Sequence, residues 1–207
     1  MVSLRTLATA VLAVPLVSAL TASQIVQNIR TLTTKSQALQ APAQSISIIN
    51  GPLIIIGQGP FPILIAGFTD IVSTATVAIA AMTEDRDTIA DVPGAKAIAD
   101  AFREFVRVHQ ALLNILIGKA GLLNPLPIVG QPIATILRQI ESVVDTIAYG
   151  LIDIISPADE RRMITSDSNS LHGTIEVSIK AYEGVDVGNL DLGNVGVGKK
   201  AKRAFVA

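Results

Sequence analysis

Apolar residues recur at helical spacing between Ile133 and Ile155, and this run constrains the fold more than any other part of the chain. Residues three and four positions apart lie on one face of an α-helix, so the run predicts a long helix with one apolar face. Such a face must be buried against partner elements. The repeat consists of Ile133, Ile136, Leu137, Ile140, Val143, Val144, Ile147, Leu151, Ile154 and Ile155.

The same spacing returns in four other stretches, which cover residues 25–49, 63–82, 91–116 and 158–182. Pro42 is expected to kink the first helix, because a proline ring displaces a backbone hydrogen bond. Residues 53–62 and 118–132 are rich in Pro and Gly and are predicted to be loops. In the last stretch Gly173 and the β-branched residues near Val177 also fit a strand. The sequence therefore predicts an all-α fold, a bundle of four to five amphipathic helices.

Both ends of the chain are expected to lie outside the bundle. Arg5 precedes an apolar stretch that is too short to span a bilayer, and small residues follow at Ala19 and Ala22. This pattern is typical of a cleavable secretory signal, here residues 1–22, with cleavage expected after Ala19 or after Ala22. The Gly/Val-rich basic tail, residues 184–207, has no periodicity and is predicted to be disordered. We therefore expect a secreted protein, extracellular or in the cell wall, with a folded domain at residues 23–183.

Composition and charge exclude several classes of protein. Cysteine is absent, so the fold holds no disulfide and the chain is no hydrophobin. Half of the residues are hydrophobic but only 3% are aromatic, which predicts a core of Ile, Leu, Val and Ala. The net charge of the whole chain is −1, and the tail is net positive. The folded domain therefore has a more negative charge than the whole chain. The remaining, weakly acidic domain offers no basic surface for nucleic acid.

Motifs for catalysis, cofactors and metals are missing, so we expect a protein that is not an enzyme and has no metal site. The sequence has no Gly-x-Ser-x-Gly elbow, no cysteine nucleophile and no histidine pair at metal-binding spacing. The run Gly193–Lys199 resembles a phosphate-binding loop, but Lys200 stands where Ser or Thr is needed. His109 lies alone in an apolar stripe, where a histidine is a core residue or a hydrogen-bond partner of a ligand headgroup.

Residues on the inward faces of three predicted helices form the candidate binding site. Few aromatic side chains are available to fill the space between these faces, so we expect it to accept an acyl chain, with His109 near the polar end. An apolar loop must be buried or be a contact surface, and Ile55 in the Ile54–Ile56 run is expected at the mouth. The site residues are Phe68, Val72, Phe102, Phe105, His109, Ile140, Val144 and Ile55.

The combined pattern resembles the fungal hydrophobic surface-binding protein family, also called cell-wall galactomannoproteins. The resemblance covers residues 23–183 and rests on the first helix from Ser23 to Gly51, the stretches Phe61–Met82 and Ile98–Leu116, the helix to Ile155 and the ending Ser178-Ile179-Lys180-Ala181-Tyr182. It implies a secreted, non-enzymatic helical protein that binds lipids, such as fatty acyl chains, or a hydrophobic polymer surface. It also implies that a secreted esterase or the cell wall can be a partner.

Two other functions stay open on the sequence. One is a structural cell-wall mannoprotein or antigen without a small ligand. The other is a small membrane protein anchored by residues 63–82, a window of about 20 residues in which Asp70 is the only charge. An acid inside a span costs about 2.5–3.5 kcal/mol, and the polar residues of this window gather on one side. We therefore expect no stable membrane span.

Overall fold

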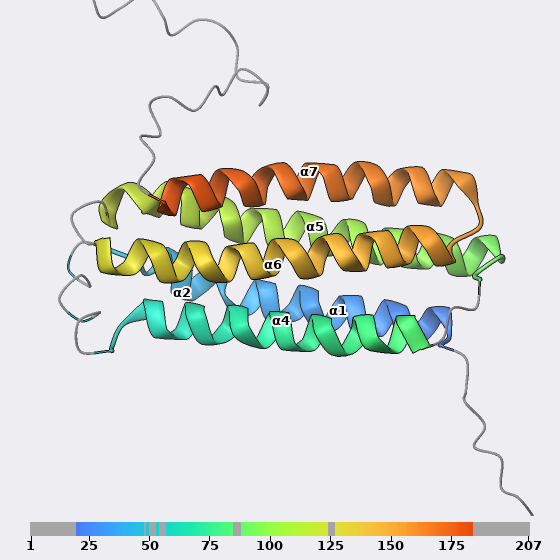
Figure 1. The fold of residues 1–207 in the computed structure, drawn as a ribbon, viewed down its shortest axis with the longest axis horizontal. Coiled ribbons are helices and arrows are strands. Elements are labelled where there is room, and N and C mark those ends of the chain that lie inside the picture. Colours follow the sequence, from blue (N-terminus) through green and yellow to red (C-terminus); the bar gives the residue numbers. More distant parts are fainter. Residues whose placement is uncertain are drawn as a thin grey trace, which may run out of the picture.

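The structure is a computed structural model that describes residues 20–47, 49, 53, 57–84, 88–123 and 127–183. Its long helices lie side by side (Figure 1): α1 (Ala22–Ala38), α4 (Pro60–Glu84), α5 (Val92–Ala120), α6 (Pro127–Ile154) and α7 (Ala158–Tyr182). The short helix α2 (Gln40–Gln44) continues α1, and the 3-10 turn η2 (Gly121–Leu123) follows α5. The predicted all-α bundle is confirmed. Most of the predicted signal and the predicted tail lie outside the described residues.

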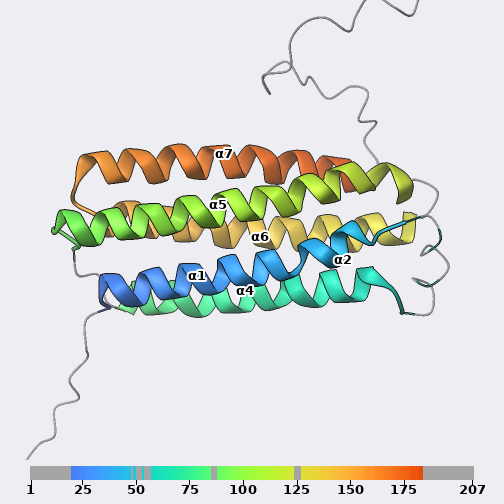
Figure 2. The same cartoon turned by 180° about the vertical axis from the view of Figure 1, so that it is seen from behind.

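The five long helices close into a ring. Helix α1 packs against α4 and α5, α5 also packs against α7, and α6 joins α7 to α4, as the two views show (Figure 1 and Figure 2). A ring of helices has a central space that side chains must fill. Phe68 of α4, Phe105 of α5, Ile140 of α6 and Leu171 of α7 lie in this core with at most 2% of their surface exposed.

Helix α1 begins at a capping box and ends at a proline-induced break. The Thr21 hydroxyl accepts from the Gln24 backbone N–H at 3.3 Å, and the Gln24 side chain accepts from the Thr21 N–H at 2.8 Å. Pro42 has no N–H to donate to the carbonyl of Ala38, four residues earlier. Accordingly α1 ends at Ala38 and the chain turns at Leu39 before α2, which confirms the predicted kink.

Two predicted loops are wrong in their bounds because proline is tolerated at a helix start. Helix α4 begins at Pro60, inside the predicted loop of residues 53–62. The N–H groups of a first turn have no intrahelical partner, so prolines there cost no hydrogen bond. Helix α6 also begins at a proline, Pro127, and contains a second one, Pro132, beyond its first turn. Most of the predicted loop of residues 118–132 is therefore helical.

Helix α7 is continuous, so the alternative of a strand near Val177 is wrong. Its buried residues include Ile164, Leu171, Ile175 and Ile179, which repeat at helical spacing. These side chains face α5 and α6, and this packing outweighs the cost of about 0.5–1 kcal/mol for Gly173 in a helix.

Helix α4 exposes two large apolar side chains on its outer face, which also carries polar residues such as Asp70. Ile63 is 55% exposed and Val77 is 69% exposed. By length and composition α4 is the one helix of the described chain that is able to cross a bilayer. Its inner face nevertheless belongs to the bundle core, and Asp70 forms an ion pair with Lys35 of α1.

Gly130 permits close contact between α6 and the end of α7. A Cβ atom at Gly130 would lie 2.4 Å from the carbonyl oxygen of Tyr182, a backbone atom that moves only if α7 moves. The Tyr182 hydroxyl fixes the same end to α5 by donating to the carbonyl oxygen of Leu116 at 3.0 Å. Burial raises the pKa of Tyr182, so this hydroxyl keeps its hydrogen at neutral pH.

Gly130→Ala is expected to lower the free energy of unfolding by about 1–3 kcal/mol, the usual cost of overpacking, although alanine favours a helix. Gly118→Ala is the matched control, because a Cβ atom at this position of α5 meets no atom within 4 Å. The control is expected to raise stability by about 0.5–1 kcal/mol. Urea denaturation measures both variants, and equal stabilisation of both would show that α6 and α7 do not make this contact.

Candidate ligand-binding site

A buried polar pair lies in the apolar core. His109 of α5 and Ser36 of α1 are both fully buried. The Ser36 hydroxyl donates to the carbonyl oxygen of Leu32 at 2.9 Å, and its oxygen lies 2.9 Å from Nδ1 of His109. A hydroxyl has one hydrogen, so the hydrogen between Ser36 and His109 comes from the imidazole. With the hydroxyl hydrogen donated to Leu32, Nδ1 of His109 is the protonated nitrogen.

The other imidazole nitrogen, Nε2, is a hydrogen-bond acceptor without a donor. It is buried, and no polar atom of the described residues lies within hydrogen-bond distance of it. Loss of hydration lowers the pKa of His109 to about 4, so the imidazole is neutral at neutral pH. An unpaired buried acceptor costs about 1–3 kcal/mol. Nε2 is thus a place where a hydrogen-bond donor of a ligand would be stabilised.

Aromatic rings surround the imidazole. The Phe105 ring centroid lies 5.3 Å from that of His109, and the Phe68 centroid lies 6.3 Å away in an edge-on arrangement. Phe102 stacks next to Phe105, with 6.2 Å between the ring centroids. The structure thus brings four of the residues proposed from the sequence into one cluster. Side chains of this kind present an apolar wall with a single polar atom in it.

The other residues proposed from the sequence lie around this cluster or outside the described chain. Ile140 and Val144 of α6 are buried in the same core, and Val72 of α4 is half-buried against it. Ile55 lies outside the described residues. Contact of these residues with a ligand stays a prediction.

Sequence analysis missed Ser36. This residue occupies a core-facing position of the first helical repeat, between Leu32 and Leu39, where a hydrophobic residue is expected. A polar residue in such a position needs a partner, and that signal points to a buried polar pair. It does not identify the partner, because His109 is 73 positions away along the chain.

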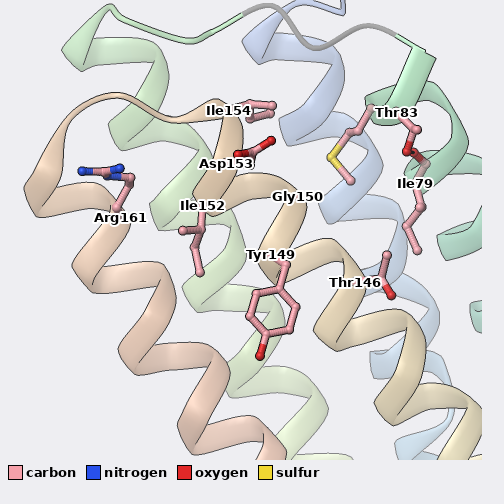
Figure 3. Close-up of a pocket in the computed structure, with 10 residues that line it drawn as sticks. Ile79, Thr83, Thr146, Tyr149, Gly150, Ile152, Asp153, Ile154 and Arg161 are labelled. Carbon is pink, nitrogen blue, oxygen red and sulfur yellow. Dashed lines mark hydrogen bonds between the residues drawn. The ribbon is translucent and has the colours of Figure 1, made fainter.

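Three hollows adjoin at the end of the bundle where α1 begins and where α4 and α6 end. The innermost is a void of about 10 Å³, roughly the space of one water molecule. A groove of about 480 Å³ between α1 and α4 shares Asn28 and Ala78 with this void. A larger groove of about 580 Å³ shares Met82 with it (Figure 3). The void is lined by Ile25, Asn28, Ile29, Leu32, Ala78, Met82, Ile147 and Leu151.

The void therefore shares lining residues with both surface grooves. Met82 is one of them, and an unbranched methionine side chain changes its rotamer readily. The larger groove wraps around the end of α6: Figure 3 shows Tyr149 and Ile152 on one side of this helix and Thr146 on the other, near Ile79 of α4. Tyr149 is 72% exposed, so the rim of the groove carries a large apolar ring.

A second cluster of titratable side chains lies on the surface between α6 and α7. Glu141, His172 and Glu176 offer possible metal-ligand atoms within 4.8 Å of one another. Nδ1 of His172 lies 3.5 Å from Asp145 and 3.7 Å from Glu141. These distances fit partly exposed ion pairs that form when the histidine is protonated, and such pairs contribute about 0–1 kcal/mol. The cluster links α6 and α7 at the surface and is charged, whereas the candidate ligand-binding site is apolar and lies in the core.

Comparison with known proteins identifies the fold. No family model and no curated protein sequence matches this chain. AfMP4p in complex with palmitic acid has a similar structure, with a TM-score of 0.68, 16% identity, and coverage of 78% of this chain and 99% of that chain.

The two ligand-binding domains of the MP1 protein of Penicillium marneffei are also similar. Domain 2, complexed with multiple arachidonic acids, matches with a TM-score of 0.62, 14% identity, and coverage of 78% of this chain and 94% of its own. Domain 1, complexed with arachidonic acids, matches with a TM-score of 0.62, 13% identity, and coverage of 77% and 95%. The chain thus shares its fold with ligand-binding proteins that were solved in complex with fatty acids.

Proposed function

We propose that this protein is a secreted, non-enzymatic protein that binds a fatty acid inside its helical ring. The unpaired Nε2 of His109 supports this most strongly, because it places one polar atom in an otherwise apolar core. A fatty acid combines a single polar group with a long apolar chain and matches that arrangement. The fold shared with fatty-acid complexes supports the same proposal.

The proposed path of the acyl chain follows α1 from Ser36 to Ile25, a distance of about 16 Å along the helix axis. The polar end lies at His109, and the chain passes Leu32 to reach the void. Each buried CH₂ group contributes about 0.8 kcal/mol to binding. The mouth lies at Met82, where the void adjoins the larger groove.

A void of about 10 Å³ is far too small for an acyl chain, so binding must displace core side chains. Helix α4 is the element whose displacement would open the proposed path, because it lines the void and its seam with α1 is the least extensive in the ring. In this structure Ala78 and Met82 close around the void. We expect ligand binding to stabilise an open arrangement by population shift.

Ala78→Leu is expected to weaken palmitic acid binding at least tenfold, because the larger side chain fills the void. Ala80→Leu makes the same change at an exposed position of the same helix and is expected to leave the affinity unchanged. Isothermal titration calorimetry measures both variants and the unaltered protein, and circular dichroism checks that they are folded. Folded, unaltered protein without saturable binding would refute the proposed function, and equal affinities of the two variants would place the ligand outside the void.

Adsorption to a hydrophobic surface is a second candidate function, favoured by the exposed Ile63 and Val77 on the outer face of α4. Lysine at both positions is expected to reduce adsorption to a hydrophobic polyester without changing palmitic acid binding. Equal adsorption of the variant and the unaltered protein would reject this face. A secreted esterase as partner, and a place in the cell wall, are proposed from the family resemblance alone.

Secretion is also proposed, and the capping box of α1 distinguishes the two cleavage sites. Removal of residues 1–19 keeps Thr21 and its bonds with Gln24. Removal of residues 1–22 eliminates the cap, at a cost of about 1 kcal/mol. We therefore expect the mature protein to begin at Leu20. Edman sequencing of protein from culture medium tests this, and a sequence that starts at Met1 would contradict secretion by signal cleavage.

A further inference from the structure

The tautomer of His109 determines whether a hydrogen-bond donor or an acceptor of a ligand can bind to Nε2. When Ser36 donates its hydroxyl hydrogen to the carbonyl oxygen of Leu32, its oxygen accepts from Nδ1–H of His109, and the ligand preference follows from this arrangement. The neutral imidazole has one hydrogen. Nε2 therefore has a lone pair and no hydrogen, and it binds a donor but not an acceptor.

Among the residues that the structure describes, no charged side chain contributes to the pKa of His109. Ser36 and Leu32 come from α1, Phe68 from α4 and Phe105 from α5. Loss of hydration is the one cause of the lowered pKa of His109, without a contribution from a charged neighbour. An ionised carboxylate that entered this core would have neither a cation nor a donor there, and burial of an unpaired charge is strongly unfavourable.

From this geometry we infer that the site selects ligands whose polar end donates a hydrogen bond, namely a protonated carboxylic acid or a long-chain alcohol. It excludes acyl esters and ionised carboxylates. This inference deepens the proposed function and rests on it. The acid O–H donates to Nε2, and the Nδ1–H bond to Ser36 is kept.

Binding of a fatty acid is then linked to uptake of one proton. Free carboxylic acids ionise near pH 4 to 5, so most of the acid is the carboxylate at neutral pH. The complex contains one more proton than the separate carboxylate and neutral imidazole. Affinity for the acid should therefore fall about tenfold per pH unit above its pKa, by linkage.

The test compares three ligands with the same chain: decanoic acid, 1-decanol and methyl decanoate. Titration calorimetry with the full chain at several pH values from 5.5 to 8 measures each Kd. The Kd of 1-decanol is expected to be independent of pH, and that of decanoic acid to rise about tenfold per pH unit. Methyl decanoate is expected to bind at least tenfold more weakly than 1-decanol, since it leaves Nε2 unpaired.

Ser36→Ala tests the role of the serine. Without the serine oxygen, the imidazole hydrogen is free to move to Nε2, where an ester carbonyl can accept it. The preference for 1-decanol over methyl decanoate is expected to fall at least fivefold, because the ester gains affinity. Ser178→Ala is the matched control: Ser178 is also fully buried and donates to the carbonyl oxygen four residues earlier, that of Thr174, at 2.9 Å. Ser178→Ala is expected to keep the preference for 1-decanol over methyl decanoate.

The possible results separate the inference from the function on which it rests. If none of the three ligands binds to folded protein, the proposed function is wrong. If they bind but the unaltered protein does not distinguish the alcohol from the ester, the inference is wrong and fatty-acid binding stands. A Kd of decanoic acid that does not change with pH would show that the carboxylate is bound, and it would also overturn the inference.

Discussion

A decrease in pH from 7 to 4 is expected to destabilise the protein by about 3 kcal/mol through His109 alone. Its pKa is about 4 in the folded protein and about 6.5 in an unfolded chain. As the pH falls through 6.5, the unfolded chain takes up a proton that the folded protein does not accept until about pH 4. The unfolded state is therefore stabilised throughout this window, and the effect is constant below it.

Urea denaturation at pH 7 and pH 4 measures this effect when the unaltered protein is compared with His109→Leu. Carboxyl groups titrate in both proteins, so they contribute equally to the change in the free energy of unfolding between the two pH values. The part of this change that differs between the proteins is the contribution of His109. The free energy of unfolding of the unaltered protein is compared with that of His109→Leu at each pH. If the difference between the two proteins is the same at both pH values, His109 is not buried as described.

Phe105→Ala is expected to lower the free energy of unfolding by about 3–5 kcal/mol, the usual cost of removing a buried phenylalanine. Phe105 is 2% exposed and contacts the rings of Phe102 and His109. The neighbouring side chains come from rigid, mutually packed helices, so the cavity collapses only in part. Palmitic acid is expected to raise the midpoint of thermal unfolding more in this variant than in the unaltered protein, because its chain fills the cavity.

The control for this variant is Tyr149→Ala, which removes an aromatic side chain that is 72% exposed. Substitutions at such surface positions usually change stability by about 0.5 kcal/mol or less. Thermal unfolding followed by circular dichroism compares the two variants with and without ligand. A small and similar loss of thermal stability in both variants would mean that Phe105 is not part of a packed core.

Helical periodicity was sufficient to predict most of the fold. Each apolar repeat corresponds to a helix, because one buried face per helix is what a bundle requires. The errors concern Pro60 and Pro127, which were assigned to the interior of loops but stand at the start of a helix. A sequence pattern cannot distinguish these cases, since proline fits both. The helix at Val177 shows that packing outweighed β-propensity.

The candidate site was predicted only in part. Phe68, Phe105 and His109 were placed on inward faces by their spacing, and the structure brings them together. Ser36 and the hydrogen-bond direction that it imposes depend on a contact between α1 and α5, which no local pattern encodes. The mouth of the acyl-chain site was predicted at Ile55, which lies outside the described residues. The hollows described above lie where α4 ends, and Met82 was identified only as a core residue.

The most direct measurement of the central claim is a crystal structure of the protein with palmitic acid. The expected result is a carboxyl oxygen within hydrogen-bond distance of Nε2 of His109, with the chain extending along α1 past Leu32 towards Met82. Helix α4 should be displaced from its position in the unliganded structure. Palmitic acid found only in the surface grooves, above an unchanged Ser36–His109 core, would contradict binding inside the ring.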